Sequence, residues 1–173
     1  RSRQNSAGRR WPGWRGRSRD ARVAWLPERL PDQPVTVWKR PLFTEGLGGV
    51  AMADGIVLVG DRDTDDRHDV FHAVDFATGA RLWTLEYPAD GRLDYGNSPR
   101  ATPLIHDGHA FLLGAFGHLH CVRLADGRIV WKRHLRHDFN ATSELVWGVC
   151  SSPLIADGRL IVNPGGPDGS VVA

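Results

Sequence analysis

The chain has 173 residues, and 22 lysines and arginines against 20 acidic residues give it a formal net charge of +2. Seven tryptophans, 20 glycines and 11 prolines against a single methionine are atypical of a helix bundle and favour many short strands joined by tight turns. No run of about 18 apolar residues is present, so the sequence predicts no transmembrane helix.

The first 34 residues are predicted to be an arginine-rich linker or leader remnant. Residues 1–30 carry nine arginines against Asp20 and Glu28, a local balance of +7, which leaves −5 for the rest of a chain whose total is +2. An arm of this kind could bind nucleic acid or an anionic membrane. Because the basic residues do not continue along the folded region, we favour the linker and expect no nucleic-acid partner.

Residues 35–173 contain two sequence blocks that recur in the same order. The first block is an Asp-Gly pair between apolar runs, found at 54–60, 107–114 and 157–163. The second block ends in tryptophan and is found at 73–83 and 121–131. Asp-Gly between apolar runs predicts a tight hairpin, because both residues tolerate a positive φ. Recurrence at about 50 residues predicts a repeat architecture.

Each repeat unit is predicted to be a four-stranded antiparallel blade of a β-propeller. In the second unit the strands are expected at 102–105, 110–113, 117–123 and 128–131. The predicted blades run over about 46–87 and 97–135, with an incomplete third at 147–173. The residues expected to build this repeat are Trp38, Asp75, Gly79, Trp83, Gly127 and Trp131. A tryptophan wedged at each blade junction would bury roughly 150–250 Å².

An additional strand is predicted ahead of the first blade. Trp38 lies 45 residues before Trp83 and has no earlier strands of its own. Residues 35–40 are therefore expected to form an N-terminal closing strand that completes the last blade of the ring. The blades still missing from this partial propeller are expected to come from the rest of the same chain.

The second block carries a family resemblance. Residues 73–83 match the pattern A-x-D-x-x-T-G-x-x-x-W, and so resemble the repeat of the pyrroloquinoline quinone (PQQ)-like propeller family. The copy at 121–131 departs from that pattern, with Cys121, Arg123 and Asp126 in place of Ala, Asp and Thr. Residues 11–16 are also similar to the lead-in of bacterial envelope proteins of this family.

The resemblance implies a non-catalytic binding or scaffold module in the periplasm or cell envelope, with a protein partner or a small ligand at the propeller axis. The alternative that it raises is part of a PQQ-dependent quinoprotein dehydrogenase that oxidises alcohols. Such enzymes hold PQQ and Ca²⁺ beside a catalytic Asp and often a pair of adjacent cysteines. Because the chain has neither adjacent cysteines nor a recognisable catalytic Asp motif, we predict no catalytic, cofactor-binding or metal-binding residue.

The start of the first strand in blades two and three is the candidate ligand-facing position. This strand lies nearest the axis of a propeller, where propellers bind ligands. The residues at these positions are Arg100, Thr102, Trp147, Ser151 and Ser152. The alternative is that the arginine and the serines cap strand ends.

Three other groups are considered and set aside. Residues 61–66 offer alternate carboxylates like the opening of a Ca²⁺ loop, but a solvated loop is favoured. His118 and His120 share one strand face, as in a transition-metal site, but a packing or surface role is favoured. Cys121 and Cys150 are expected to be buried thiols, and a disulfide between them is the alternative in an oxidising compartment.

Overall fold

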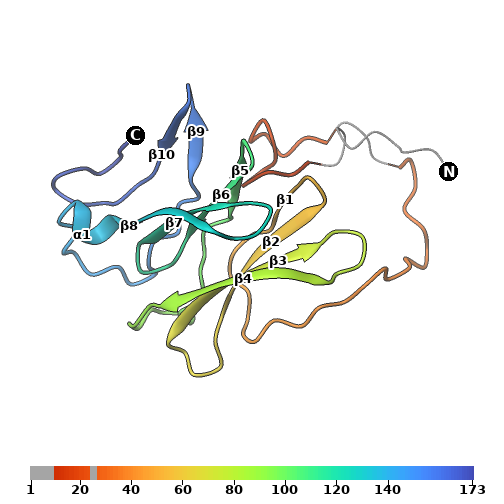
Figure 1. The fold of residues 1–173 in the computed structure, drawn as a ribbon, viewed down its shortest axis with the longest axis horizontal. Coiled ribbons are helices and arrows are strands. Elements are labelled where there is room, and N and C mark those ends of the chain that lie inside the picture. The colour runs from red at the N-terminus through yellow and green to blue at the C-terminus, as the bar shows by residue number, and fades with distance from the viewer. Residues whose placement is uncertain (1–9, 24–26) are drawn as a thin grey trace.

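The computed structural model describes residues 10–23 and 27–173, and the rest of the predicted linker lies outside these residues. The protein has two four-stranded antiparallel sheets and one two-stranded sheet (Figure 1). Blade one consists of β1 (Ala51–Ala53), β2 (Ile56–Arg62), β3 (His68–Asp75) and β4 (Arg81–Pro88). Blade two consists of β5 (Leu104–His106), β6 (His109–Leu113), β7 (His118–Arg123) and β8 (Ile129–His134). The predicted all-β architecture of antiparallel four-stranded blades is confirmed.

The third blade is smaller than the other two. Its hairpin pairs β9 (Leu154–Ala156) with β10 (Arg159–Ile161), and an isolated bridge between Val162 and Val172 continues it. Between blades two and three lies a short helix, α1 (Leu135–Asp138). Among the described residues, no helix has the length and apolarity needed to cross a membrane.

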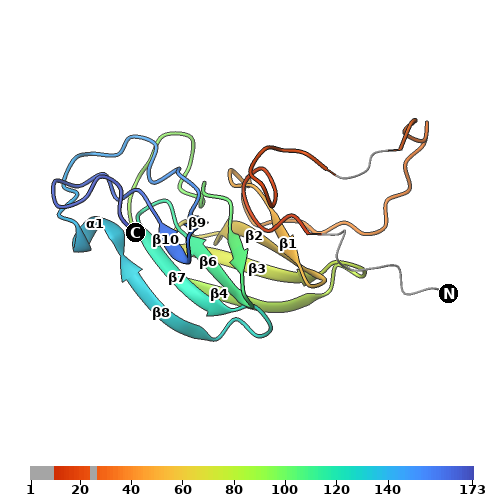
Figure 2. The same cartoon turned by 90° about the horizontal axis from the view of Figure 1, so that it is seen from above.

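The two ends of the blades differ, because hairpin turns gather at one end and longer connections at the other (Figure 2). At the turn end each blade has an Asp-Gly pair, and Asp54, Asp107 and Asp157 adopt positive φ values of 52°, 45° and 49°. We call the opposite end the loop end. It carries residues 43–50, 63–67, 89–103, 114–117 and 135–153.

Blade one packs on blade two through one face of β4. Along this strand Trp83, Leu85 and Tyr87 are buried while their neighbours are exposed. They join a core cluster with residues of β6 and β7, among them Leu112 and Val122. The two sheets therefore stack face to face, as the tryptophan repeat predicts (Figure 2).

The contact between Trp83 and Gly127 is repeated one blade earlier by Trp38 and Gly79. The Trp83 indole N–H donates to the Leu124 carbonyl at 2.8 Å, and a Cβ on Gly127 would lie 2.7 Å from Cδ2 of that indole. Trp38 donates to the Phe76 carbonyl at 2.8 Å, and a Cβ on Gly79 would lie 2.7 Å from its Cδ2. Each turn needs glycine both for its positive φ, 72° and 69°, and for the room that the indole occupies.

Two expectations about the tryptophans are corrected. Residues 35–40 form no strand, because no neighbouring strand among the described residues pairs with them, although Trp38 occupies the place that a closing strand would give it. Trp131 is 37% exposed and packs on Phe111 of its own blade. The described part of the third blade offers it no turn equivalent to that of Gly127.

Asp75 holds the turn of the complete repeat copy. Its Oδ1 accepts from the backbone N–H groups of Ala77 and Thr78 and from the Thr78 hydroxyl. In the second copy Arg123 stands in place of Asp75 and pairs with Asp126, which stands in place of Thr78 and accepts from the Arg128 N–H as Thr78 accepts from the Ala80 N–H. The two copies thus fold alike despite the three departures from the repeat pattern.

Candidate functional site

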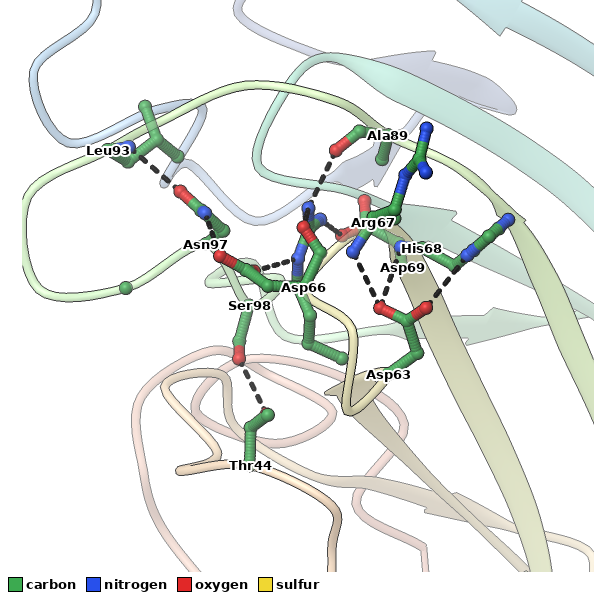
Figure 3. Close-up of polar contacts among 12 residues, drawn as sticks. Thr44, Asp63, Asp66, Arg67, His68, Asp69, Ala89, Leu93, Asn97 and Ser98 are labelled. Atoms are coloured by element: carbon green, nitrogen blue, oxygen red, sulfur yellow. Dashed lines mark hydrogen bonds and ion pairs between the residues drawn. The ribbon is translucent and has the colours of Figure 1, made fainter.

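A buried ionic network supports the loop end of blade one (Figure 3). The Arg62 side chain at the end of β2 is 1% exposed, and its guanidinium donates to Asp69 at 2.9 Å and to Asp66 at 2.6 Å. It also donates to the Ala89 carbonyl at 2.8 Å and stacks on Phe116, with its Cζ 5.3 Å from the ring centroid. A buried guanidinium requires this number of acceptors, so the network fixes the β2–β3 connection to the chain that leaves β4.

The same network holds the long loop between the two blades. The Asn97 side chain donates to Asp66 Oδ2 at 2.7 Å, and its Oδ1 accepts from the Leu93 N–H at 2.8 Å. The neighbouring Ser98 hydroxyl lies 3.0 Å from the Thr44 hydroxyl, in the segment that enters blade one. Residues 93–98 are therefore tied at both sides, although their tip is exposed (Figure 3).

Asp69 has the most perturbed carboxyl group of this network. Burial raises the pKa of Asp69 to about 6, against the opposing effects of the Arg62 guanidinium and the Tyr87 hydroxyl, which donates to it at 3.2 Å. A carboxyl with this pKa could act as an acid or base, but Asp69 is fully buried and both oxygens are bonded to protein groups. Its role is therefore to hold the blade junction.

The carboxylates of residues 61–66 do not form a calcium loop. Asp61 is fully buried and accepts from the Phe43 N–H and from His72 Nε2, at 2.9 and 3.0 Å, and not from solvent as a solvated loop would. Burial acts to raise the pKa of Asp61, but these hydrogen bonds hold it below its usual value. Asp63 instead caps the β2–β3 connection by accepting from the Arg67 and His68 N–H groups.

The candidate ligand-facing residues fall into three groups by their hydrogen bonds and exposure. Arg100 donates to the carbonyls of Trp147, Asp94 and Gly96, the last at 2.6 Å, so it joins the loops that precede blades two and three. Thr102 is buried, and its N–H donates to Ser152 Oγ at 2.9 Å. Ser151 is exposed, and its side chain forms no hydrogen bond with the residues that the structure describes. The structure thus brings Arg100 and Trp147 together, and separately Thr102 and Ser152.

Large apolar side chains are exposed on the loops that Arg100 joins. Tyr95 is 83% exposed and Trp147 is 63% exposed, and the exposed apolar residues Phe43, Leu47 and Val146 are also at the loop end. Residues 43–50, 63–67, 89–103 and 135–150 carry eight acidic residues against four arginines, a formal balance of −4. We call Tyr95, Arg100 and Trp147 the loop-end patch. It combines aromatic surface with an acidic surround.

The paired histidines face blade one. His120 stacks on Tyr87 at a centroid distance of 4.3 Å, and His118 lies 5.2 Å from the same ring. Burial lowers the pKa of each histidine to about 4, and neither Nδ1 has a hydrogen-bond partner within residues 10–23 and 27–173. His72 in blade one has Asp61 as its partner, whereas Gly114 stands at the matching place in blade two. The two repeats therefore use equivalent histidines differently.

In the part of the chain that the structure describes, no three histidine, cysteine, aspartate or glutamate side chains are grouped to hold a metal ion. Both cysteines are free: Cys121 is buried, as expected, but Cys150 is exposed because it lies in the loop before blade three.

Sequence reasoning missed the Arg62 network. The available signal was the charged triplet Asp61-Arg62-Asp63 directly after the apolar run of β2. Charged residues that continue a buried strand require partners, so this pattern can indicate an internal ion pair. The identity of those partners depends on the fold, because Ala89 and Asn97 come from beyond β4.

Comparisons with known proteins agree with the repeat. A family model described as outer membrane protein assembly factor BamB matches residues 66–173, and no protein of curated function matches the chain. The solved structure of BamB from Moraxella catarrhalis is similar over 68% of this chain and 30% of that chain, with 22% identity and a TM-score of 0.45. Quinohemoprotein alcohol dehydrogenase from Comamonas testosteroni is similar over 70% of this chain and 17% of that chain, with 22% identity and a TM-score of 0.51. The chain thus spans less than a third of either structure, and the second likeness shows the fold alone.

Proposed function

The chain belongs to the outer membrane protein assembly factor BamB family, and from that premise we propose that it is a non-catalytic binding module of the bacterial cell envelope. The proposed partner is a protein that docks on the loop-end patch. Fold alone does not assign this role, so the support must come from the surface itself.

The observation that carries the proposal is that Tyr95 and Trp147 are exposed on loops whose backbones are fixed by hydrogen bonds to Asn97 and Arg100. Aromatic residues and arginine dominate the energetically important positions of protein interfaces. A rigid loop loses little conformational entropy when it binds. Arg100 joins the two loops, and Asn97 anchors the loop of Tyr95 to the buried network. The patch is therefore both exposed and ordered.

Charge indicates what kind of partner this patch accepts. The loop-end segments have a formal balance of −4, so they attract a basic surface and repel an acidic one. We propose a partner that presents arginine or lysine side chains around an apolar centre. Grooves of about 460 and 480 Å³ flank the patch, one along residues 144–151 and one between Thr44 and Tyr95.

The test uses the full-length protein in its host envelope. Tyr95→Ala and Trp147→Ala are each expected to weaken binding of an identified envelope partner by tenfold or more, the size of effect found at hot spots. Leu82→Ala is the matched control, since Leu82 is 47% exposed on β4 near the turn end and should leave affinity unchanged.

A turnover assay separates this role from the dehydrogenase. The same protein, supplied with PQQ, Ca²⁺, a primary alcohol and an artificial electron acceptor, is expected to show no alcohol-dependent reduction. Alcohol-dependent turnover would refute the non-catalytic assignment. Equal binding by the loop-end variants and the Leu82 control would refute the assignment of the patch.

A further inference from the structure

The arginine-rich arm is bound to the innermost strands of the blades. Trp11 forms an antiparallel bridge with Met52 of β1, with N–H···O distances of 2.8 and 2.7 Å. The next residue, Pro12, accepts from the Ile105 N–H of β5 at 2.6 Å. The arm contacts the third blade through Arg19, whose guanidinium donates to the Pro153 carbonyl at 3.1 Å. One short segment therefore contacts all three blades, and Figure 1 shows it beside β1 and β5.

These contacts satisfy a general need of the inner strands. Among the strands that the structure describes, β1 pairs only with β2, and β5 only with β6, so each leaves one edge without a partner strand. Free edges expose N–H and C=O groups that readily accept an added strand. Peptides that add to such edges gain affinity from main-chain hydrogen bonds. The bonds of Met52 and Ile105 to the arm are of this kind.

The arm has a defined conformation and close contacts. Gly13 and Gly16 are both buried, and a Cβ on Gly13 would lie 3.0 Å from the Leu104 side chain of β5. Gly16 has a φ of 81°, and a Cβ there would lie 2.9 Å from the Trp11 ring, so the segment folds back over its own indole. Glycine is required at this position because both the φ and the contact exclude a side chain.

Charge complements the hydrogen bonds. The aspartates of the inner hairpins, Asp54 and Asp107, line a cavity of about 700 Å³ together with Arg17 and Arg19. Arg10 pairs with Asp54 at 2.7 Å, although both side chains are largely exposed and such a pair stabilises little. The turn end thus presents acidic residues to a basic segment of the same chain.

We propose that the inner edges of β1 and β5, with the start of β9, form a groove for a peptide segment, and that residues 11–19 of this chain are its occupant, paired to the edges at Trp11 and Pro12 and folded back beyond them. The segment links the three blades at the axis through its hydrogen bonds to Met52, Ile105 and Pro153. Axial strand edges are then filled from within the molecule, and a partner docks at the loop end without competing for them. This assignment does not depend on the identity of that partner.

Hydrogen exchange on the 173-residue chain tests the groove. Gly16→Val is expected to displace the segment and to accelerate exchange of the Met52 and Ile105 amides at least tenfold, with the amides of β7 unchanged. Gly96→Val is the matched control, because Gly96 has a φ of 91° but open space around its Cβ position. It should leave Met52 and Ile105 as slow as in the parent chain.

A peptide added in trans provides the second measurement. A synthetic peptide of residues 10–22, added to the Gly16→Val chain, is expected to restore slow exchange at both amides. Unchanged exchange in Gly16→Val, or no recovery with the peptide at millimolar concentration, would overturn the proposal. Acceleration that includes β7 equally would also overturn it, since a groove occupant acts on the inner edges.

Discussion

The substitution Gly127→Ala adds one methyl group at the junction between blades one and two, beside the Trp83 indole. Gly127 has a φ of 72°, and its new Cβ would lie 2.7 Å from Cδ2 of Trp83. The indole would have to shift, and its N–H would lose the 2.8 Å hydrogen bond to Leu124. Gly108 in the same blade has a φ of 68° and no atom within 4 Å of its Cβ position, so Gly108→Ala carries the same backbone strain without the contact.

The magnitudes separate the two variants. A left-handed alanine costs about 1–2 kcal/mol in each. Gly127→Ala adds overpacking of about 1–3 kcal/mol and loss of a hydrogen bond of about 1 kcal/mol. We expect the free energy of unfolding to fall by about 3–6 kcal/mol in Gly127→Ala and by about 1–2 kcal/mol in Gly108→Ala.

Urea unfolding followed by far-UV circular dichroism measures both values. In a Trp83→Ala background the indole is absent, so Gly127→Ala should then cost no more than Gly108→Ala. Equal losses for the two single variants in the parent chain would refute the tryptophan–glycine junction. A Gly127 effect that persists unchanged in the Trp83→Ala background would refute it as well.

Three further outcomes are expected. Arg62→Ala leaves the buried Asp69 carboxyl without its cation and should lower the free energy of unfolding by about 3–5 kcal/mol. Burial lowers the pKa of His120 from the usual 6.5 to about 4, so the unfolded chain binds more protons than the folded protein between these values. Stability should therefore fall as the pH is lowered through this window. Asp69 opposes this trend, since its pKa near 6 keeps it protonated in the folded protein where the unfolded carboxyl is ionised. Iodoacetamide should label Cys150 in the native protein and Cys121 only after unfolding, as one thiol is exposed and the other is buried.

Each of these predictions has a control. Arg92→Ala removes an exposed arginine and should change stability by less than about 0.5 kcal/mol, so an equal effect at Arg62 would contradict the network. His120→Leu should flatten the pH dependence, whereas His106→Gln, at an exposed site, should not. Native labelling of both cysteines in peptide mass spectra would contradict the burial of Cys121.

Local sequence patterns predicted the hairpins well. Asp-Gly pairs require positive φ, and the three turns at Asp54, Asp107 and Asp157 have it. The equivalence of Trp38 and Trp83 followed from spacing alone, because each meets a glycine at the same place in the next turn. These features depend on residues close in the repeat, so the sequence contains them directly.

Features that depend on distant partners were not predictable. The basic composition of the arm indicated a linker, but the hydrogen bonds of Trp11 and Pro12 use backbone groups that no side-chain pattern reveals. The exposure of Trp131 depends on the third blade and not on its own repeat. At the loop end, Arg100 was singled out from its position, but its carbonyl partners lie in loops without a repeat pattern.

Site-specific photo-crosslinking in host cells tests the central claim, that the loop end is the surface that meets a protein partner. A photoreactive amino acid at position 95 or 147 of the full-length protein is expected to give one discrete envelope-protein adduct, and the same group at position 107, on the turn end, is expected to give none. An adduct formed as strongly from position 107, or none from positions 95 and 147, would contradict this account.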